Sequence, residues 1–185
     1  REIIFVDDSL LLPPDRIISI LKGITKLRES GVDLIWKSNN LDLRHIPLRK
    51  KITSEDKDLL FWMKQSGCYQ ISISLESGSE NTFKRMRRPT NLKHAIERLE
   101  LIREYGYDEV CSNFIVGMPG DTWNDILTTF EFADRIVNHD RLLDYALFSI
   151  ATPLPATELA DNAIKMGMLP KDFKPEDFYG FGKGV

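Results

Sequence analysis

The chain has 185 residues, of which 42% are hydrophobic and 29% charged, as expected for one globular domain with a sizeable core. Twenty-five basic and 28 acidic side chains give a net charge of -3, which argues against nucleic acid or an anionic membrane as a partner. No apolar run approaches the roughly 20 residues that cross a bilayer, and the first residues lack the organisation of a signal peptide. We therefore expect a cytoplasmic protein that acts on a small molecule or a peptide.

Short apolar segments alternate with longer amphipathic ones, a pattern typical of βα units around a parallel sheet. The strands are predicted at residues 3–6, 34–36, 69–75, 110–116 and 143–150. Proline or capping signals begin the helices that follow, at residues 13–15, 53–56, 89–91, 121–122 and 152–155. The chain enters its first strand without a methionine or leader, so we expect it to be part of a longer protein.

Five consecutive βα units predict either an open doubly wound sheet or a closed or partial (β/α) barrel, with residues 1–185 as a single domain. Both architectures bind ligands at the carboxyl ends of the strands. Polar or glycine residues follow each predicted strand, at Asp7, Asp8, Asn39, Asn40, Glu76, Ser77, residues 117–120 and Thr152. Such a ring suits a small polar ligand.

Individual motifs leave alternatives open. Asp7 and Asp8 could bind a divalent cation, orient a ligand amine or cap a turn. Glu76 is more informative, because it stands beside Ser77 and Gly78, where a ligand hydroxyl pair could approach the backbone closely; a solvated loop acid is the alternative. One arginine of the basic run 84–88 could pair with a ligand carboxylate.

Several other sites are disfavoured. Residues 117–120 lack the lysine and the spacing of a phosphate-binding loop. The two cysteines, Cys68 and Cys111, have no second cysteine or histidine at ligand spacing, so we expect two buried thiols and no metal. The three histidines are scattered, and we assign them no role.

Five segments, in this order, resemble the radical S-adenosylmethionine (SAM) superfamily. They are residues 5–10 (FVDDSL), 72–79 (SISLESGS), 86–90 (MRRPT), 113–122 (NFIVGMPGDT) and 152–159 (TPLPATEL). The sequence is most similar to the branch whose members often carry a cobalamin-binding domain, such as the anaerobic magnesium-protoporphyrin monomethyl ester cyclases.

The resemblance implies an α/β fold, a partial (β/α)6 TIM-like barrel whose first strand precedes a CxxxCxxC loop that holds a [4Fe-4S] cluster. That segment would lie before Arg1, so this chain would supply strands two to six and lack the first βα unit. The SAM amine and carboxylate bind the cluster, and reductive cleavage gives a 5'-deoxyadenosyl radical that abstracts hydrogen from an organic substrate. Cobalamin would be a further cofactor of the full-length protein.

The resemblance also assigns the first part of a SAM site. Asp7 and Asp8 match the strand end that faces the methionine amine, and Glu76, followed by Ser77, matches a residue that contacts SAM. Arg88 falls where an arginine meets the SAM carboxylate. An ammonium group needs acceptors and a carboxylate suits a guanidinium, so these assignments are chemically consistent.

The rest of the predicted SAM site lies in the fourth strand and its turn. Asn113 matches a position that contacts the ribose, and Val116 and Gly117 match the segment that lines the adenine. Ala156 replaces the glycine usual in the family, and the cluster motif is absent from the 185 residues. We therefore expect no radical activity from this chain alone.

Two other functions compete with this hypothesis. One is a non-catalytic βα scaffold that binds a ligand or a protein, and the other is a metal-dependent hydrolase that uses Asp7, Asp8 and Glu76. A missing first unit would also leave the apolar strand at 3–6 unpaired, so we expect self-association through that edge.

Overall fold

The computed structural model describes residues 1–7, 10–39, 41–42, 46, 54–86 and 91–174. Its centre is a parallel five-stranded sheet in the order β1-β2-β3-β4-β5. The strands are β1 (Glu2–Phe5), β2 (Ile35–Ser38), β3 (Cys68–Glu76), β4 (Glu109–Val116) and β5 (Tyr145–Ile150). The helices are α1 (Pro14–Glu29), α2 (Ser54–Gln65), α3 (Glu80–Arg85), α4 (Leu92–Glu104), α5 (Trp123–Asp134), a π-helical turn η3 (Arg135–His139) and α6 (Glu158–Lys165). Each strand is followed by a helix, which confirms the predicted βα order.

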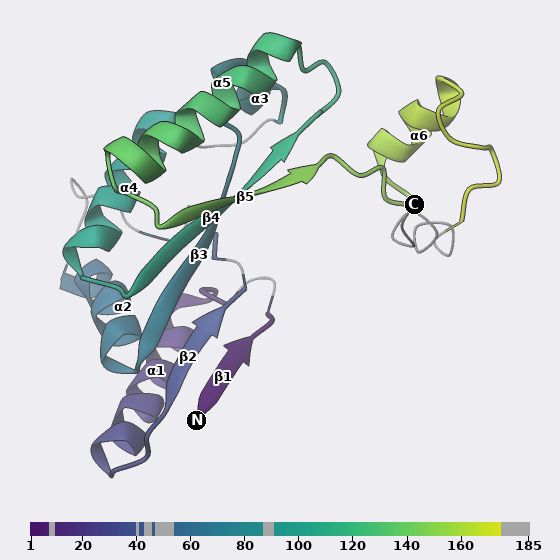
Figure 1. The fold of residues 1–185 in the computed structure, drawn as a ribbon. Helices are drawn as coiled ribbons and strands as arrows, with labels where there is room; N and C mark the ends of the chain where they lie inside the picture. Colours follow the sequence, from purple (N-terminus) through teal and green to yellow (C-terminus); the bar gives the residue numbers. More distant parts are fainter. Residues whose placement is uncertain (8–9, 40, 43–45, 47–53, 87–90, 175–185) are drawn as a thin grey trace.

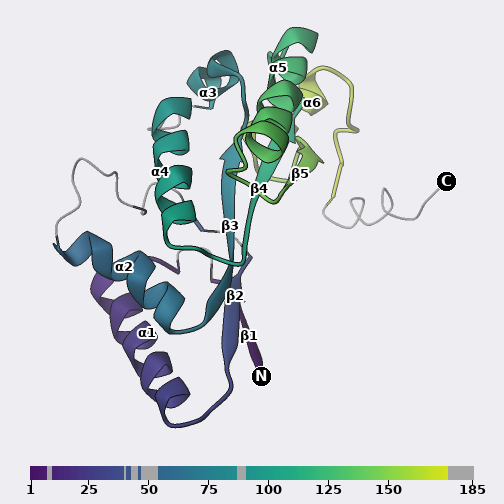
Figure 2. The same cartoon turned by 60° about the vertical axis from the view of Figure 1, so that its left-hand side comes forward.

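Helices α1 to α5 all lie on one face of the sheet, and the two views in Figures 1 and 2 agree on this layering. The opposite face is not covered by these helices. Helix α6 lies apart from the helical layer, beyond the end of β5 (Figure 1). None of the helices in the described part of the chain is long and apolar enough to cross a bilayer.

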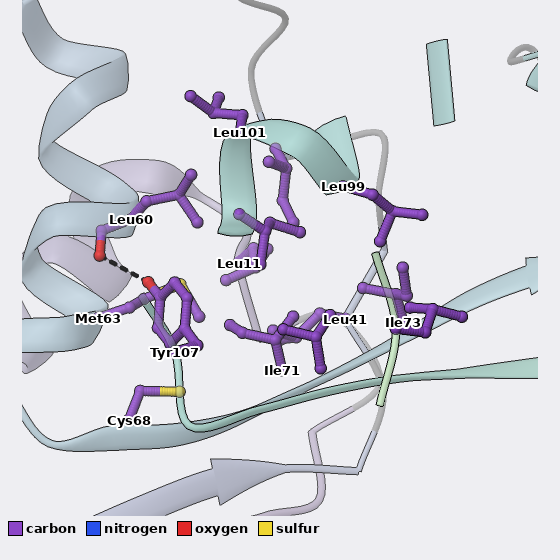
Figure 3. Packing of buried hydrophobic residues seen from close by; sticks show 14 of the residues in the cluster. Leu11, Leu41, Leu60, Met63, Cys68, Ile71, Ile73, Leu99, Leu101 and Tyr107 are labelled. Atoms are coloured by element: carbon purple, nitrogen blue, oxygen red, sulfur yellow. Dashed lines mark hydrogen bonds between the residues drawn. The ribbon is translucent and has the colours of Figure 1, made fainter. Parts of the chain in front are cut away.

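Strand β3 lies at the centre of the sheet. Its side chains alternate between the two faces, and those that point toward the helices form the centre of the core. Ile71 and Ile73 are fully buried, and they join an apolar cluster with Met63 of α2 and Leu99 of α4 (Figure 3). Burying one such side chain stabilises the fold by about 1.5–3 kcal/mol. The sheet therefore gains most of its stability on the helical side, which leaves residues of the other face available for a ligand.

Most strand boundaries differ from the prediction by one or two residues, and the start of β5 has an identifiable cause. The predicted fifth strand begins at 143, whereas β5 begins at Tyr145. The backbone amides of Leu142 and Leu143 donate to the carbonyl oxygen of Ile136, at 2.8 and 3.1 Å, so both residues continue the turn after η3. Both side chains are buried, and an apolar pair in a buried turn has the same hydrophobic signal as the start of a strand.

Ala156, which departs from the family pattern, adopts a backbone conformation that favours glycine, with φ at 62°. The residue precedes Thr157, the N-cap of α6, whose hydroxyl accepts a hydrogen bond from the amide of Ala160. The turn is therefore kept even though a Cβ is present.

A buried hydrogen bond ties the core to the turn before β4, and it gives a test of the packing. The hydroxyl of Tyr107 donates to the carbonyl oxygen of Leu60 at 2.6 Å (Figure 3), and burial raises the pKa of the phenol. We expect Tyr107→Phe to lower the free energy of unfolding by about 1 kcal/mol, because a buried carbonyl loses a partner. Urea denaturation measures the change. Tyr69→Phe, which removes an exposed bond to Glu2, is the control and should cost less; an equal loss in both variants would contradict this view.

Candidate functional site

The carboxyl ends of the five strands lie at one edge of the sheet because all the strands run parallel. Glu76 is the last residue of β3 and pairs with Phe114, while Asn113 pairs with Ser74. Val116 ends β4 and pairs with Ile150 of β5, and Gly117 follows directly. Four of the predicted site residues, Glu76, Asn113, Val116 and Gly117, therefore lie on two neighbouring strands or just after them.

The backbone of Glu76 departs from a regular strand. The register of β3 against β4 shifts between Ser74 and Glu76, and Glu76 has a φ of 71°, uncommon for any residue except glycine. The hydroxyl of Ser112 accepts a hydrogen bond from the amide of Leu75 at 3.1 Å, which satisfies this donor beside the irregularity. Such irregularities re-aim side chains and are frequent next to functional sites, where strained backbone conformations also cluster.

The loop after β3 is fastened to α5. The hydroxyl oxygens of Ser77 and Thr129 lie 3.0 Å apart, and the amide of Gly78 donates to Thr129 Oγ1 at 3.2 Å. Ser77 is fully buried and its side chain faces α5, while its amide donates to the carbonyl oxygen of Leu75 at 2.9 Å. A Cβ on Gly78 would lie 2.5 Å from the Cβ of Phe132, and glycine is therefore required at this contact.

The turn after β4 is built from two glycines and an aspartate. Gly117 and Gly120 have φ values of 77° and 82°, which glycine adopts without strain. The carboxylate of Asp121 accepts a hydrogen bond from the amide of Met118 at 2.8 Å. Thr122 then caps α5, because its hydroxyl accepts from the amide of Asp125 while the Asp125 carboxylate accepts from the Thr122 amide. The conformation of the turn is therefore set by its two glycines and by hydrogen bonds among its own residues.

An ionic network around two buried carboxylates joins these two loops. The hydroxyl of Ser79 donates to Asp125 Oδ1 at 2.6 Å, and the guanidinium of Arg85 lies 2.5 Å from Asp121 Oδ1 and 3.4 Å from Asp125 Oδ2. The pKa of Asp125 is lowered, first by the Ser79 hydroxyl and then by the backbone amide and hydroxyl of Thr122. Sequence analysis singled out Arg88 in this basic run and missed Arg85. The one signal for the network was the capping pair Thr122 and Asp125, at a spacing typical of a helix start.

Of the three remaining predicted residues, Asp7, Asp8 and Arg88, the structure describes only Asp7. Asp7 follows β1 and lies 3.6 Å from the guanidinium of Arg16 in α1. Asp7 does not lie beside Glu76, because β2 separates their strands and the register places Asp7 about three residues short of Glu76 along the sheet, a separation of roughly 14 Å. Asp8 and Arg88 lie outside the described residues.

The cysteines lie far apart in the sheet. Cys111 pairs with Ser72, four residues along β3 from Cys68, a separation of about 13 Å. Both thiols are buried, and burial raises the pKa of Cys68. No group of three or more histidine, cysteine, aspartate or glutamate residues that could hold a metal ion is found in the described part of the chain. The two thiols therefore do not fit an iron-sulfur cluster.

The chain resembles known SAM enzymes in sequence and in fold. Residues 1–133 match the profile of the radical SAM superfamily. An uncharacterised methyltransferase of Pyrococcus horikoshii is 26% identical over 91% of the chain and 33% of its own length. A proposed methylthiotransferase of Methanocaldococcus jannaschii is 32% identical over 76% of the chain and 29% of its own length. The radical SAM methyltransferase TsrM of Kitasatospora setae, solved with cobalamin and a [4Fe-4S] cluster bound, aligns with a TM-score of 0.63 at 15% identity, over 89% of the chain and 30% of TsrM.

The chain belongs to the radical SAM superfamily, because the family profile covers more than half of it. The partial-barrel fold is confirmed by the structural likeness to TsrM. Enzymes of this family use SAM and a [4Fe-4S] cluster. The chain spans about a third of the length of the relatives it matches, 33% of the P. horikoshii protein and 29% of the M. jannaschii protein.

The buried state of the two thiols can be tested directly. We expect neither Cys68 nor Cys111 to react with a chromogenic disulfide reagent in the native chain, because both are enclosed and thiolate formation at Cys68 is disfavoured. Two thiols should react once guanidinium unfolds the chain. Incubation with ferrous iron and sulfide should leave no bound iron after gel filtration. Fast reaction of both native thiols, or stoichiometric iron, would refute this assignment.

Proposed function

We propose that this chain is the SAM-binding part of a radical SAM enzyme, with SAM held along the carboxyl ends of β3 and β4. Glu76 and Asn113 accept hydrogen bonds from the polar groups of SAM, Val116 and Gly117 line its adenine, and Ser77 contributes its backbone carbonyl oxygen. Asp7 and Asp8 face its amine, and Arg88 pairs with its carboxylate. The unusual conformation of Glu76 at the register shift of β3 is the observation that carries this proposal.

Each described residue has chemistry that suits its role. The carboxylate of Glu76 offers acceptors to an amine or to ribose hydroxyls, and charge-assisted bonds of this kind are the stronger ones. Asn113 is partly buried on the adjacent strand and can both donate and accept. Val116 gives an apolar surface and Gly117 an exposed backbone, which together suit a neutral purine. Asp7, already paired with Arg16, lies on the far side of β2.

In the full protein, one-electron reduction of bound SAM would break its sulfonium C5' bond and give methionine and a 5'-deoxyadenosyl radical, which takes a hydrogen atom from an organic substrate. Because Cys68 and Cys111 do not fit a cluster, the three thiolates would come from residues outside these 185. The isolated chain is therefore proposed to bind SAM without cleaving it.

The relatives favour group transfer as the reaction class of the full protein. The P. horikoshii relative is named a methyltransferase, the M. jannaschii relative a methylthiotransferase, and TsrM a methyltransferase that was solved with cobalamin. We infer transfer of a methyl or methylthio group, with cobalamin as a further cofactor where methyl transfer is the reaction. The competing function, a βα scaffold that binds another ligand or a protein, makes the opposite prediction for SAM.

Calorimetric titration of the chain with SAM tests the site. We expect wild-type chain to bind SAM and Glu76→Gln to weaken binding by about 10- to 100-fold, because one charge-assisted hydrogen bond contributes roughly 1.5–3 kcal/mol. Glu109→Gln is a matched control, since Glu109 begins β4 at the opposite edge of the sheet. This variant should bind SAM with the affinity of the wild type. No heat from the wild-type chain would favour the scaffold, and an unchanged affinity in Glu76→Gln would remove Glu76 from the site.

We also propose that the isolated chain self-associates through the edge of β1. This strand pairs with β2 on one side, and Ile3, Ile4 and Val6 are exposed by 36%, 48% and 76%. An apolar strand with an open edge is a template for pairing with another chain.

Sedimentation velocity measures this association. We expect a dimer or larger species that Ile4→Lys converts to monomer, because a lysine on an edge strand opposes pairing. Ile20→Lys is the control, since Ile20 is 38% exposed on α1, away from the edge, and should leave the association unchanged. A wild-type chain that stays monomeric at high concentration would contradict the proposal.

A further inference from the structure

Arg85 bridges the two loops that frame the proposed SAM site. It ends α3, which follows the loop after β3, and its guanidinium donates to Asp121 in the turn after β4 at 2.5 Å. The same nitrogen lies 2.9 Å from Thr82 Oγ1, and that hydroxyl donates to Asp121 Oδ1 at 2.7 Å. Residues about 40 positions apart in the sequence are thereby held at hydrogen-bond distance.

The two carboxylates of this cluster depend on Arg85 for their charge balance. The side chains of Asp121 and Asp125 are only 5% and 4% exposed, and both pair with Arg85, whose own side chain is 34% exposed. Among the described residues, Arg85 is the cation that pairs with either of them. Two carboxylates that lose their shared cation repel each other, and the Ser79 and Thr122 donors, which stabilise the charged form of Asp125, leave that repulsion in place.

The cluster lies a few residues from the proposed ligand contacts. Ser79, which donates to Asp125 at 2.6 Å, is three residues beyond Glu76. Asp121, which accepts from the amide of Met118, is four residues beyond Gly117. A movement of either anchor would therefore shift Glu76 or Gly117, two of the proposed SAM contacts. A misplacement of about 1 Å at such positions is enough to impair a site.

We infer that Arg85, with Asp121 and Asp125, is a positioning residue that locks the loop after β3 to the turn after β4 and so sets the affinity for SAM. This inference rests on the proposed function for its ligand. The lock between the loops can be measured without any ligand.

A pair of arginine substitutions separates positioning from stability. Arg85→Met is compared with Arg103→Met, because Arg103 also joins two elements through an aspartate, at 3.0 Å from Asp144, but at the opposite edge of the sheet. Both variants should melt at lower temperature than the wild type. At a temperature where all remain folded, we expect Arg85→Met to bind SAM about tenfold more weakly and Arg103→Met to bind as the wild type does, a loss typical when a residue that orients binding groups is removed. Arg85→Lys, which keeps the charge, should recover part of the affinity.

Amide hydrogen exchange measures, without any ligand, whether Arg85 holds the loop after β3 to the turn after β4. In Arg85→Met, the amides of Gly78 and Met118 should both exchange faster, because they are bonded to Thr129 and Asp121, whereas Arg103→Met should leave them unchanged. Equal melting losses with wild-type affinity and exchange in Arg85→Met would overturn the inference and leave SAM binding intact. Failure of the wild-type chain to bind SAM would overturn the proposed function together with the affinity effect, and exchange would then decide whether the lock exists.

Discussion

The proposed site depends on the hydrogen bonds that join α5 to the loop after β3. Asp125 and Thr129, on the buried side of α5, make these bonds. Parallel strands bring their carboxyl ends to one edge, but that alone leaves the connecting loops free to move. Thr129 holds Ser77 and Gly78, while Asp125 holds Ser79 and the first turn of its own helix. One helix therefore fixes two loops, and the residues beside those loops gain defined positions.

One face of the strands packs against the helices and stabilises the fold, while the other face carries the polar residues of the proposed site. Ile71 and Ile73 are fully buried against the helices, whereas Ser74, between Ile73 and Leu75, pairs with Asn113 on the neighbouring strand. This division follows from the two-residue period of a strand. The shift at Glu76 interrupts the period at the rim, and the Ser112 hydroxyl satisfies the Leu75 amide beside it. The irregular backbone at Glu76 thus leaves the core packing of β3 intact, because it lies at the end of the strand where a ligand would bind.

Much of the fold was predictable because the local signals agreed with it. Proline and capping residues begin α1 and α5 where the sequence indicates, and glycines with positive φ stand in the turns that follow helices or strands. The start of β5 was wrong by two residues, since Leu143 is buried in a turn. The role of Arg85 was not predictable, because four basic residues stand in a run of five and only tertiary packing decides which one meets an aspartate 36 residues away.

Ala156 shows how a family pattern and a physical requirement can differ. The pattern has glycine where this chain has alanine, yet the backbone keeps the conformation for which glycine is favoured, with φ at 62°. An alanine there carries the strain that a Cβ meets in the left-handed conformation, about 1–2 kcal/mol, which the fold can absorb at one position. At Gly78 the requirement has a different cause, because a Cβ would collide with Phe132 whatever the backbone angles. A glycine kept for space tolerates less change than one kept for conformation, so the contact between the loop after β3 and α5 constrains this sequence more tightly than the turn before α6.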